Sequence, residues 1–226
     1  MRLLKATVLI FLAVFILNCG SAVKSAAPTN SYPTALGEQA WEHSRNLAVK
    51  AEDAKDPKEK SRLAQDGISA ADECIMKNPE QAECYYWRAI NTGVYYSAHV
   101  VGYQDGLKSM IRDCKKVLTL NDKLEHGGAY RTLGKIYTDV PETTITKDGV
   151  TQDLALSIAY LKKAVQIDSS YPENHIYLAE ALMAAGKKAE AISSLANAEA
   201  LVPQWKNHHD YSYWQKLNRN LSEKIK

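Results

Sequence analysis

The sequence predicts an all-α fold, a helical-repeat solenoid of about four helix pairs with a C-terminal capping helix. No segment shows sustained period-two alternation of apolar and polar residues, so no sheet is expected. Small and bulky apolar residues instead recur at helical spacings between proline and glycine breakers, most regularly over residues 172–203. The chain is therefore expected to pack helix after helix in antiparallel pairs.

Caps and breakers define the expected helices. Asp56-Pro57 places a proline at the first position of the second helix, and Val101-Gly102 separates the third helix from the fourth. The second helices of the first two pairs end in the same register, at KNP and at LTLND. The expected helices cover residues 37–54, 57–77, 79–100, 103–120, 124–138, 151–167, 172–185, 187–201 and 208–226.

The third pair is interrupted. Leu133 and Gly134 lie at helical spacings from Tyr130 and Tyr137 in its first helix, and LSIAYLKKAVQIDSS supplies the bulky and small residues of its second helix. Between the two halves there are about 11 residues more than a short helix-helix turn needs. We expect this insertion to form a long loop.

The fourth pair has the most regular spacing. Two antiparallel helices can cross closely only where their side chains are small, and Ala191 and Ala198 stand at such positions. Leu195 is the bulky apolar residue that fills the gap beside the crossing, and Pro203 is placed to start the next helix. Residues 172–203 therefore resemble one tetratricopeptide repeat. The third pair resembles a degraded copy, which agrees with the need of such units to stack.

A final helix is expected to close the stack. Its apolar residues fall at spacings of three and four, which gives one apolar face. These residues are Tyr211, Trp214, Leu217, Leu221 and Ile225.

The first 19 residues indicate an export signal. Arg2 and Lys5 precede an apolar run from Ala6 to Leu17, which is too short to span a bilayer as an anchor. The position of Cys19 straight after this run resembles a bacterial lipoprotein signal. That resemblance implies that Cys19 becomes the lipidated first residue of the mature protein.

Two neighbours of the cysteine bear on this interpretation. Asn18 departs from the small residue usual at that position, so an uncleaved or ordinary signal is the alternative. Gly20 resembles lipoproteins sorted to the outer membrane. We expect a signal peptide at residues 1–18, a flexible lipid-anchored tether at 19–33 and a helical domain at 34–226, held at the outer membrane and facing the periplasm.

Charge and cysteine content narrow the class of protein. Removal of Arg2 and Lys5 from the 28 basic residues leaves 26, which equals the 26 acidic residues, so no nucleic-acid partner is expected. Cys74 and Cys84 lie on either side of a predicted helical turn and are the preferred disulfide pair. The alternative is that Cys74, Cys84 and Cys114 are all small buried apolar residues.

The sequence contains no motif for catalysis. It lacks G-x-S-x-G, H-E-x-x-H, C-x-x-C and G-x-G-x-x-G patterns, so we expect neither an enzyme nor a cofactor. His208, His209 and Asp210 adjoin one another, but adjacent histidines on a helix point to different sides and form a poor chelate. No metal site is therefore expected.

The function that the sequence leaves open is recognition of a ligand or a partner by a helical surface. The first helices of the pairs should line the inner face of the stack, where a polar stripe on residues 79–100 and a basic pair on residues 124–138 would form a cationic, aromatic groove for an acidic ligand or protein segment. The alternative is that the rings belong to the core and the charges to a solvated face. The candidate partner- or ligand-binding residues are Tyr86, Arg88, Asn91, Tyr95, Arg131 and Lys135.

A narrower resemblance extends over residues 70–203. The segments ECYYWRAINTG, GLKSMIRDCKKVLTLND, HGGAYRTLGKIYTDVPE and YLAEALMAAG resemble the T-component family of tripartite ATP-independent periplasmic (TRAP) transporters, which are helical-repeat lipoproteins. The resemblance implies a protein partner, the transporter's solute-binding subunit, and homo-oligomers such as trimers. The matching residues are Tyr86, Arg88, Asn91, Gly128 and Arg131.

Three functions follow from these observations. The first is a periplasm-facing lipoprotein adaptor for a protein partner. The second is a structural scaffold lipoprotein for envelope assembly or secretion, which would show a large apolar patch. The third is a binding protein for a small anionic or amphipathic molecule.

Overall fold

The computed structural model describes residues 39–99, 101–144 and 147–225. The chain divides into two units, Met1–Pro33 and Thr34–Lys226, and the described residues all belong to the second unit. The expectations for the signal peptide, for Cys19 and for the tether lie outside the described residues.

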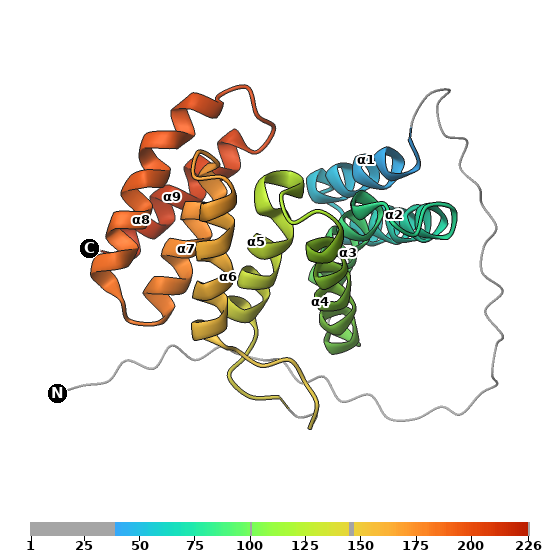
Figure 1. The fold of residues 1–226 in the computed structure, drawn as a ribbon, viewed down its shortest axis with the longest axis horizontal. Coiled ribbons are helices and arrows are strands. Elements are labelled where there is room, and N and C mark those ends of the chain that lie inside the picture. The colour runs from blue at the N-terminus through green and yellow to red at the C-terminus, as the bar shows by residue number, and fades with distance from the viewer. Residues whose placement is uncertain (1–38, 100, 145–146, 226) are drawn as a thin grey trace. The chain divides into compact units, whose positions relative to one another are not determined.

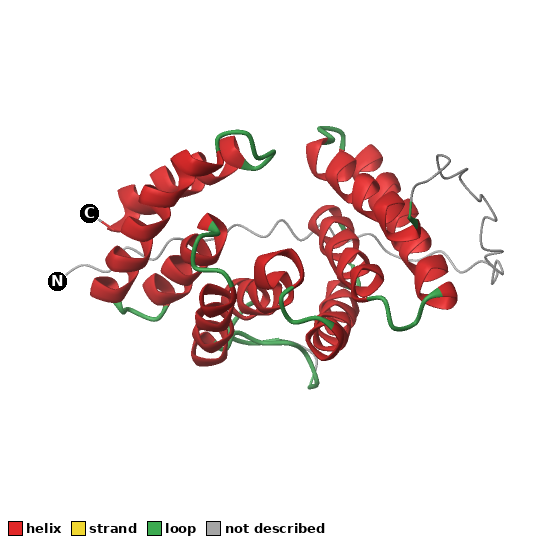
Figure 2. Cartoon of the chain, turned by 45° about the horizontal axis from the view of Figure 1, so that its top comes forward, coloured by secondary structure: helices red, strands yellow, loops and turns green. Residues whose placement is uncertain are grey.

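The described residues fold into nine α-helices and one short 3-10 helix, with no strand among them (Figures 1 and 2). This confirms the predicted all-α repeat fold. The elements are α1 (Ala40–Asp53), α2 (Pro57–Lys77), α3 (Ala82–Ala98), α4 (Tyr103–Leu120), α5 (Leu124–Asp139), α6 (Leu154–Ile167), α7 (Pro172–Ala184), α8 (Lys188–Leu201), η1 (Val202–Trp205) and α9 (Tyr211–Ile225).

Four helices begin three residues later than predicted: α1, α3, α6 and α9. The caps explain two of these differences. Before α6, the Asp153 side chain accepts a hydrogen bond from the Leu156 amide at 2.9 Å and so sets the start of the helix. Before α3, the turn after Asn78 continues to Gln81, whose amide donates to the Asn78 carbonyl at 3.1 Å.

The helices pack in the expected pairs, α1 with α2, α3 with α4, α5 with α6, and α7 with α8. Successive pairs meet where α3 contacts α2, α5 contacts α4, and α7 contacts α6. The first helices also contact one another along the series α1, α3, α5 and α7, so one continuous surface belongs to them. Helix α9 packs on α7 and α8, where Trp214, Leu221 and Ile225 are buried, as predicted for a capping helix.

The fourth pair has the packing that its spacing predicts. Ala179, Ala191 and Ala198 have no exposed surface, and Leu195 is buried beside them. In the third pair a glycine occupies the corresponding crossing. Gly134 lies so close to the Leu161 side chain that a Cβ at this position would collide with it. Small side chains at the crossings thus allow close approach of the helices in both pairs.

The predicted insertion forms the connection between α5 and α6. It is tied to the second pair, because the Val150 amide donates to the Gln104 side-chain oxygen at 2.7 Å and the Gln104 amide group donates back to the Val150 carbonyl at 3.3 Å. This exchange links the loop to α4, outside its own pair.

A disulfide joins the first pair to the second, and an ion pair joins the two helices of the second pair. Cys74 of α2 and Cys84 of α3 form the preferred disulfide, with their Cα atoms 5.6 Å apart. Arg88 of α3 donates from Nε and Nη2 to the two carboxylate oxygens of Asp113 in α4, at 2.8 and 2.6 Å. The Asp113 side chain is 1% exposed, so this charge is held in the interior by its partner.

Within the described residues no helix has both the length and the apolar character needed to cross a bilayer.

Candidate functional site

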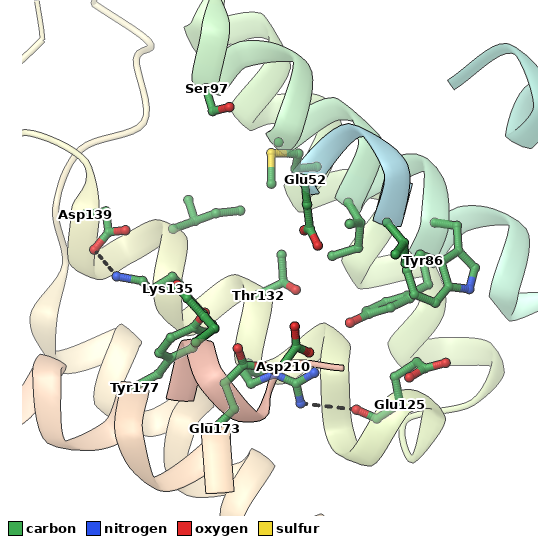
Figure 3. Close-up of a pocket in the computed structure, with 18 of the residues that line it drawn as sticks. Glu52, Tyr86, Ser97, Glu125, Thr132, Lys135, Asp139, Glu173, Tyr177 and Asp210 are labelled. Atoms are coloured by element: carbon green, nitrogen blue, oxygen red, sulfur yellow. Dashed lines mark hydrogen bonds and ion pairs between the residues drawn. The ribbon is translucent and has the colours of Figure 1, made fainter. Parts of the chain in front are cut away.

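A pocket of about 990 Å³ lies among the first helices of the four pairs. Its walls come from α1, α3, α5 and α7, with further residues from α2, from α4, from the start of α9 and from the turn that precedes it. Figure 3 shows that the labelled side chains converge on this space from several helices. The pocket is therefore a product of the repeat arrangement as a whole.

Arg131 of α5 is held rigidly in the pocket wall. Its Nε atom lies 2.8 Å from a carboxylate oxygen of Glu173, and its Nη1 atom donates to the side-chain oxygen of Asn174 at 3.1 Å. Its guanidinium lies 4.7 Å from the centre of the Tyr171 ring. Because Arg131 is only 6% exposed, this cation is already neutralised and largely covered.

The start of α5 contains a left-handed turn that supports Arg131. Glu125, His126 and Gly127 have φ angles of 49°, 59° and 79°, a region that side-chain-bearing residues rarely adopt. This turn directs the Glu125 carbonyl toward Arg131, whose Nη1 donates to it at 3.1 Å, as drawn in Figure 3. The adjacent Gly128 leaves room for Tyr86, since a Cβ there would lie 2.6 Å from the Tyr86 hydroxyl oxygen.

Lys135 lies one turn beyond Arg131 on α5 and is also paired. Its Nζ atom lies 2.9 Å from Asp139 and 3.0 Å from Glu180, and it sits 5.2 Å from the centre of the Tyr177 ring. Both cations of the predicted basic pair therefore have carboxylate partners and an aromatic neighbour.

The charge balance of the pocket contradicts the predicted cationic groove. Among the residues that line it, six are Asp or Glu and four are Lys or Arg. Arg131 and Lys135 are neutralised by Glu173, Asp139 and Glu180, so they add no net positive charge. The sequence pattern places two cations on one helix face, but it does not show that acidic residues from α7 meet them.

Two carboxyl groups in the pocket have raised pKa values. The surrounding protein, together with Asp210 and Glu173, raises the pKa of Glu52 to about 7, although the Glu52 side chain keeps contact with solvent. Burial raises the pKa of Asp210, and Glu173 raises it further against the opposing effect of His209. Because Asp210 and Glu173 raise the pKa of Glu52, and Glu173 raises the pKa of Asp210, this part of the pocket has a negative potential.

Three of the six candidate residues line the pocket: Tyr86, Arg131 and Lys135. The other three, which the helical spacing placed on the same groove, do not line it. Arg88 is bound to Asp113, and Asn91 is buried, donating to the Ser44 carbonyl at 3.0 Å. Tyr95 stacks on His99 at 4.5 Å. These three residues therefore serve helix packing, because their stripe on α3 faces the neighbouring helices.

The sequence pattern does not connect the carboxylates of Glu52, Glu173 and Asp210 with one another, and it singles out Asp210 only beside His208 and His209. Each stands singly on a different segment, so no spacing rule connects them. The only local signal is that Glu173 follows Tyr171-Pro172 in the first turn of a helix, a position that by itself explains an acidic residue.

The expectation for His208, His209 and Asp210 is wrong in its geometry. These residues lie in the turn before α9, where their potential ligand atoms are all within 4.8 Å of one another. Asp210 Oδ2 lies 3.0 Å from His209 Nε2 and 3.7 Å from His208 Nδ1. Because a turn, and not a helix, directs the two rings, the cluster has a spacing that could hold a metal ion.

Residues 152–217 match the tetratricopeptide-repeat family. The match covers α6, α7, α8 and the first part of α9, which includes the pair with the most regular spacing. No curated protein shows a significant match to the chain. The family match supports the prediction of a tetratricopeptide-repeat protein, a class in which stacked repeats present an extended surface for protein partners.

Proposed function

We propose that this protein is an adaptor that binds a segment of a partner protein in the pocket formed by α1, α3, α5 and α7. The observation that carries this proposal is that the first helix of every pair contributes to one pocket. In stacked-repeat proteins this continuous surface is the usual place for a ligand. A volume of about 990 Å³ is at the upper end of the range for ligand pockets and is large enough for several side chains.

The pocket is also preorganised. Arg131 is fixed by Glu173, Asn174 and Tyr171, and Lys135 is fixed by Asp139 and Glu180. Side chains that are already ordered lose little rotamer entropy when a partner binds. This rigidity supports binding as the role of the pocket.

We further propose that the adaptor is a lipoprotein, anchored through Cys19 in the outer membrane and facing the periplasm. The apolar run that ends directly before Asn18-Cys19 supports this location. The Cys74–Cys84 disulfide supports it independently, because disulfides persist in oxidising compartments such as the bacterial periplasm. Replacement of Cys19 by Ser should move the protein from the membrane to the soluble fraction.

The partner that we propose is a periplasmic solute-binding protein of a TRAP-type transporter, with the adaptor itself assembled as a homo-oligomer. The support is the resemblance of residues 70–203 to the T-component family, which includes Tyr86 and Arg131 of the pocket.

The test is chemical cross-linking in cells that express the tagged full-length protein, followed by purification in mild detergent and mass spectrometry. Thr132 points into the pocket (Figure 3), so Thr132→Trp should fill it and reduce recovery of the partner. Ser193→Trp, on the exposed surface of α8, is the matched control and should leave recovery unchanged. Equal recovery with Thr132→Trp and the wild type would overturn the proposal.

A second candidate is a small amphipathic molecule, because Tyr86, Trp87 and Tyr177 give the pocket an aromatic lining. An anionic ligand is less well supported, since acidic residues outnumber basic ones there. The scaffold function gains no specific support, because the exposed large apolar residues that the structure describes, such as Met76 and Ile192, lie on different helices. A thermal-stabilisation screen with amphipathic amines would show the small-molecule function.

A further inference from the structure

We propose that the bound segment is basic, and that a Lys or Arg side chain of the partner enters the pocket beside Glu52, Glu173 and Asp210. This inference rests on the proposed function and specifies the chemistry of the partner. It replaces the acidic partner that the sequence predicts.

The charges in the pocket are only partly paired. Glu173 is paired with Arg131, and Asp139 is paired with Lys135. Among the described residues, the Glu52 carboxylate has neither a hydrogen bond nor an ion pair, and the ion pairs of Asp210 are made with His208 and His209 alone. Lys60 lines the same pocket, but its Nζ atom donates to the backbone carbonyl of Glu52 at 3.0 Å. Within the part of the chain that the structure describes, the Glu52 and Asp210 carboxylates therefore form no ion pair with a Lys or Arg.

These carboxylates come from separate segments and face one space. Glu52 lies near the end of α1, whereas Asp210 lies in the turn before α9, and Figure 3 shows both directed toward the same space. Glu173 of α7 lines the same pocket and is close enough to raise the pKa of Glu52. Negative groups from three separate segments repel one another, and a cation placed among them would relieve this repulsion.

The pocket holds two of its own cations, Arg131 and Lys135, between carboxylates and aromatic rings. Arg131 lies between a carboxylate and the Tyr171 ring, and Lys135 lies between carboxylates and the Tyr177 ring. An incoming ammonium or guanidinium group would meet the same combination of carboxylates and aromatic faces, which binds cations favourably. Tyr213 lies in the same wall and makes a hydrogen bond with Tyr177.

A protein segment fits better than a free small cation. The pocket has more apolar than polar lining, with Trp87, Ile90 and Leu107 on its α3 and α4 side. These surfaces would bury the apolar side chains next to the Lys or Arg of a partner segment. We therefore expect a short sequence that combines a basic residue with apolar or aromatic neighbours.

The experiment selects phage-displayed random heptapeptides on the purified full-length protein in mild detergent. Lys and Arg should be enriched and Asp and Glu depleted among the selected peptides. Synthetic versions should lose about three- to tenfold in affinity when Glu52→Gln and Asp210→Asn are combined. The control variant Glu223→Gln, with an exposed carboxylate outside the pocket, should bind as the wild type does. Thermal melting of each variant verifies that the fold is retained.

Three outcomes would overturn the inference: selection of acidic peptides, no selection of any peptide, or the same affinity for basic peptides in the double variant. Selected peptides that still bind Thr132→Trp would also overturn it, because they would bind outside the pocket. These outcomes are distinct from failure of the proposed function. If the partner recovered from cells still depends on an open pocket, the adaptor function stands and only the charge of its ligand is wrong.

Discussion

The second and fourth helix pairs share one architecture but are held together differently. In the second pair, α3 is fixed to α4 by the ion pair between Arg88 and the buried Asp113, and to α2 by the Cys74–Cys84 disulfide. In the fourth pair, α7 and α8 meet at Ala179, Ala191 and Ala198, which have no exposed surface. An ion pair with a buried carboxylate thus does in the second pair what close contact between small side chains does in the fourth, and the disulfide ties the second pair to the first.

This difference explains why only part of the repeat array can be recognised in the sequence. Small residues at fixed spacing leave a pattern that a family comparison can match, and the match covers residues 152–217. An ion pair such as Arg88–Asp113 leaves no such pattern, since its partners are set by the three-dimensional arrangement. The Cys74–Cys84 disulfide could be predicted only because its cysteines stand on either side of one helical turn. The pocket draws on both regions, with Tyr86 from the second pair and Glu173 from the fourth.

The largest effect is expected when the ion pair of the second pair is broken. Asp113→Ala should lower the free energy of unfolding by about 3 kcal/mol, because it leaves Arg88 without its buried partner. Asp72→Ala removes the exposed partner of the same arginine and should cost less than about 1 kcal/mol. Urea unfolding measures both values. Equal losses for the two variants would show that the buried contact has no special weight.

Removal of the disulfide should have the next largest effect. The double variant Cys74→Ser/Cys84→Ser opens a link between residues separated by 10 positions, and about 2–3 kcal/mol of stability should be lost. Reduction of the wild type should give the same unfolding midpoint as the double variant. A midpoint that does not change in either case would mean that the first two pairs do not depend on this link.

Overpacking of the fourth pair should cost somewhat less. Ala198→Leu places a larger side chain at the crossing of α7 and α8 and should destabilise the fold by about 2 kcal/mol. Ala200→Leu, on the exposed side of the same helix, should be nearly neutral. Thermal melting of the two variants provides the comparison. If they melt alike, the repeat register assigned to residues 172–203 is wrong.

The smallest effect concerns the carboxylates in the pocket. Glu52 has a folded-state pKa of about 7, above its usual value of 4.5, so the native state binds more protons between these values and loses stability as the pH rises through this range. Glu52→Gln should therefore raise the free energy of unfolding by up to about 1 kcal/mol at pH 8 and leave it unchanged at pH 4. The value at pH 8 allows for screening of Glu52 by solvent. Urea unfolding at both pH values, with Glu223→Gln as a control, decides this. A gain that is the same at pH 4 and pH 8 would contradict the raised pKa.

The helices, their pairing and the capping helix could be predicted because local signals determine them. Proline at the start of α2 and α7, glycine at the α3–α4 and α7–α8 breaks, and the spacing of Ala191 and Ala198 all act within a few residues. The start of α5 is an exception. Its left-handed Glu125 and His126 have no sequence signal, because the bonds around Arg131 and between His126 and Asp168 hold them in place.

The pocket could be predicted only in part, because tertiary contacts decide which side chains reach it. Tyr86, Arg131 and Lys135 were found because they lie on first helices, whose shared surface follows from the repeat. Arg88 and Asn91 share that helix but are directed toward their neighbours, and a single helix does not reveal which of its faces is covered. The acidic residues that neutralise Arg131 and Lys135 come from α7 and from the end of α5, so the sign of the charge depends on tertiary contacts.

Site-specific photo-cross-linking tests most directly whether the partner occupies the pocket. A benzophenone amino acid would replace Ser97 at the pocket lining, and separately Ser193 on α8, in the full-length protein, and living cells would be irradiated. We predict that the Ser97 position forms a cross-link to a partner protein and that the Ser193 position does not. Cross-links from Ser193 with none from Ser97 would contradict the account and place the binding surface on the second helices.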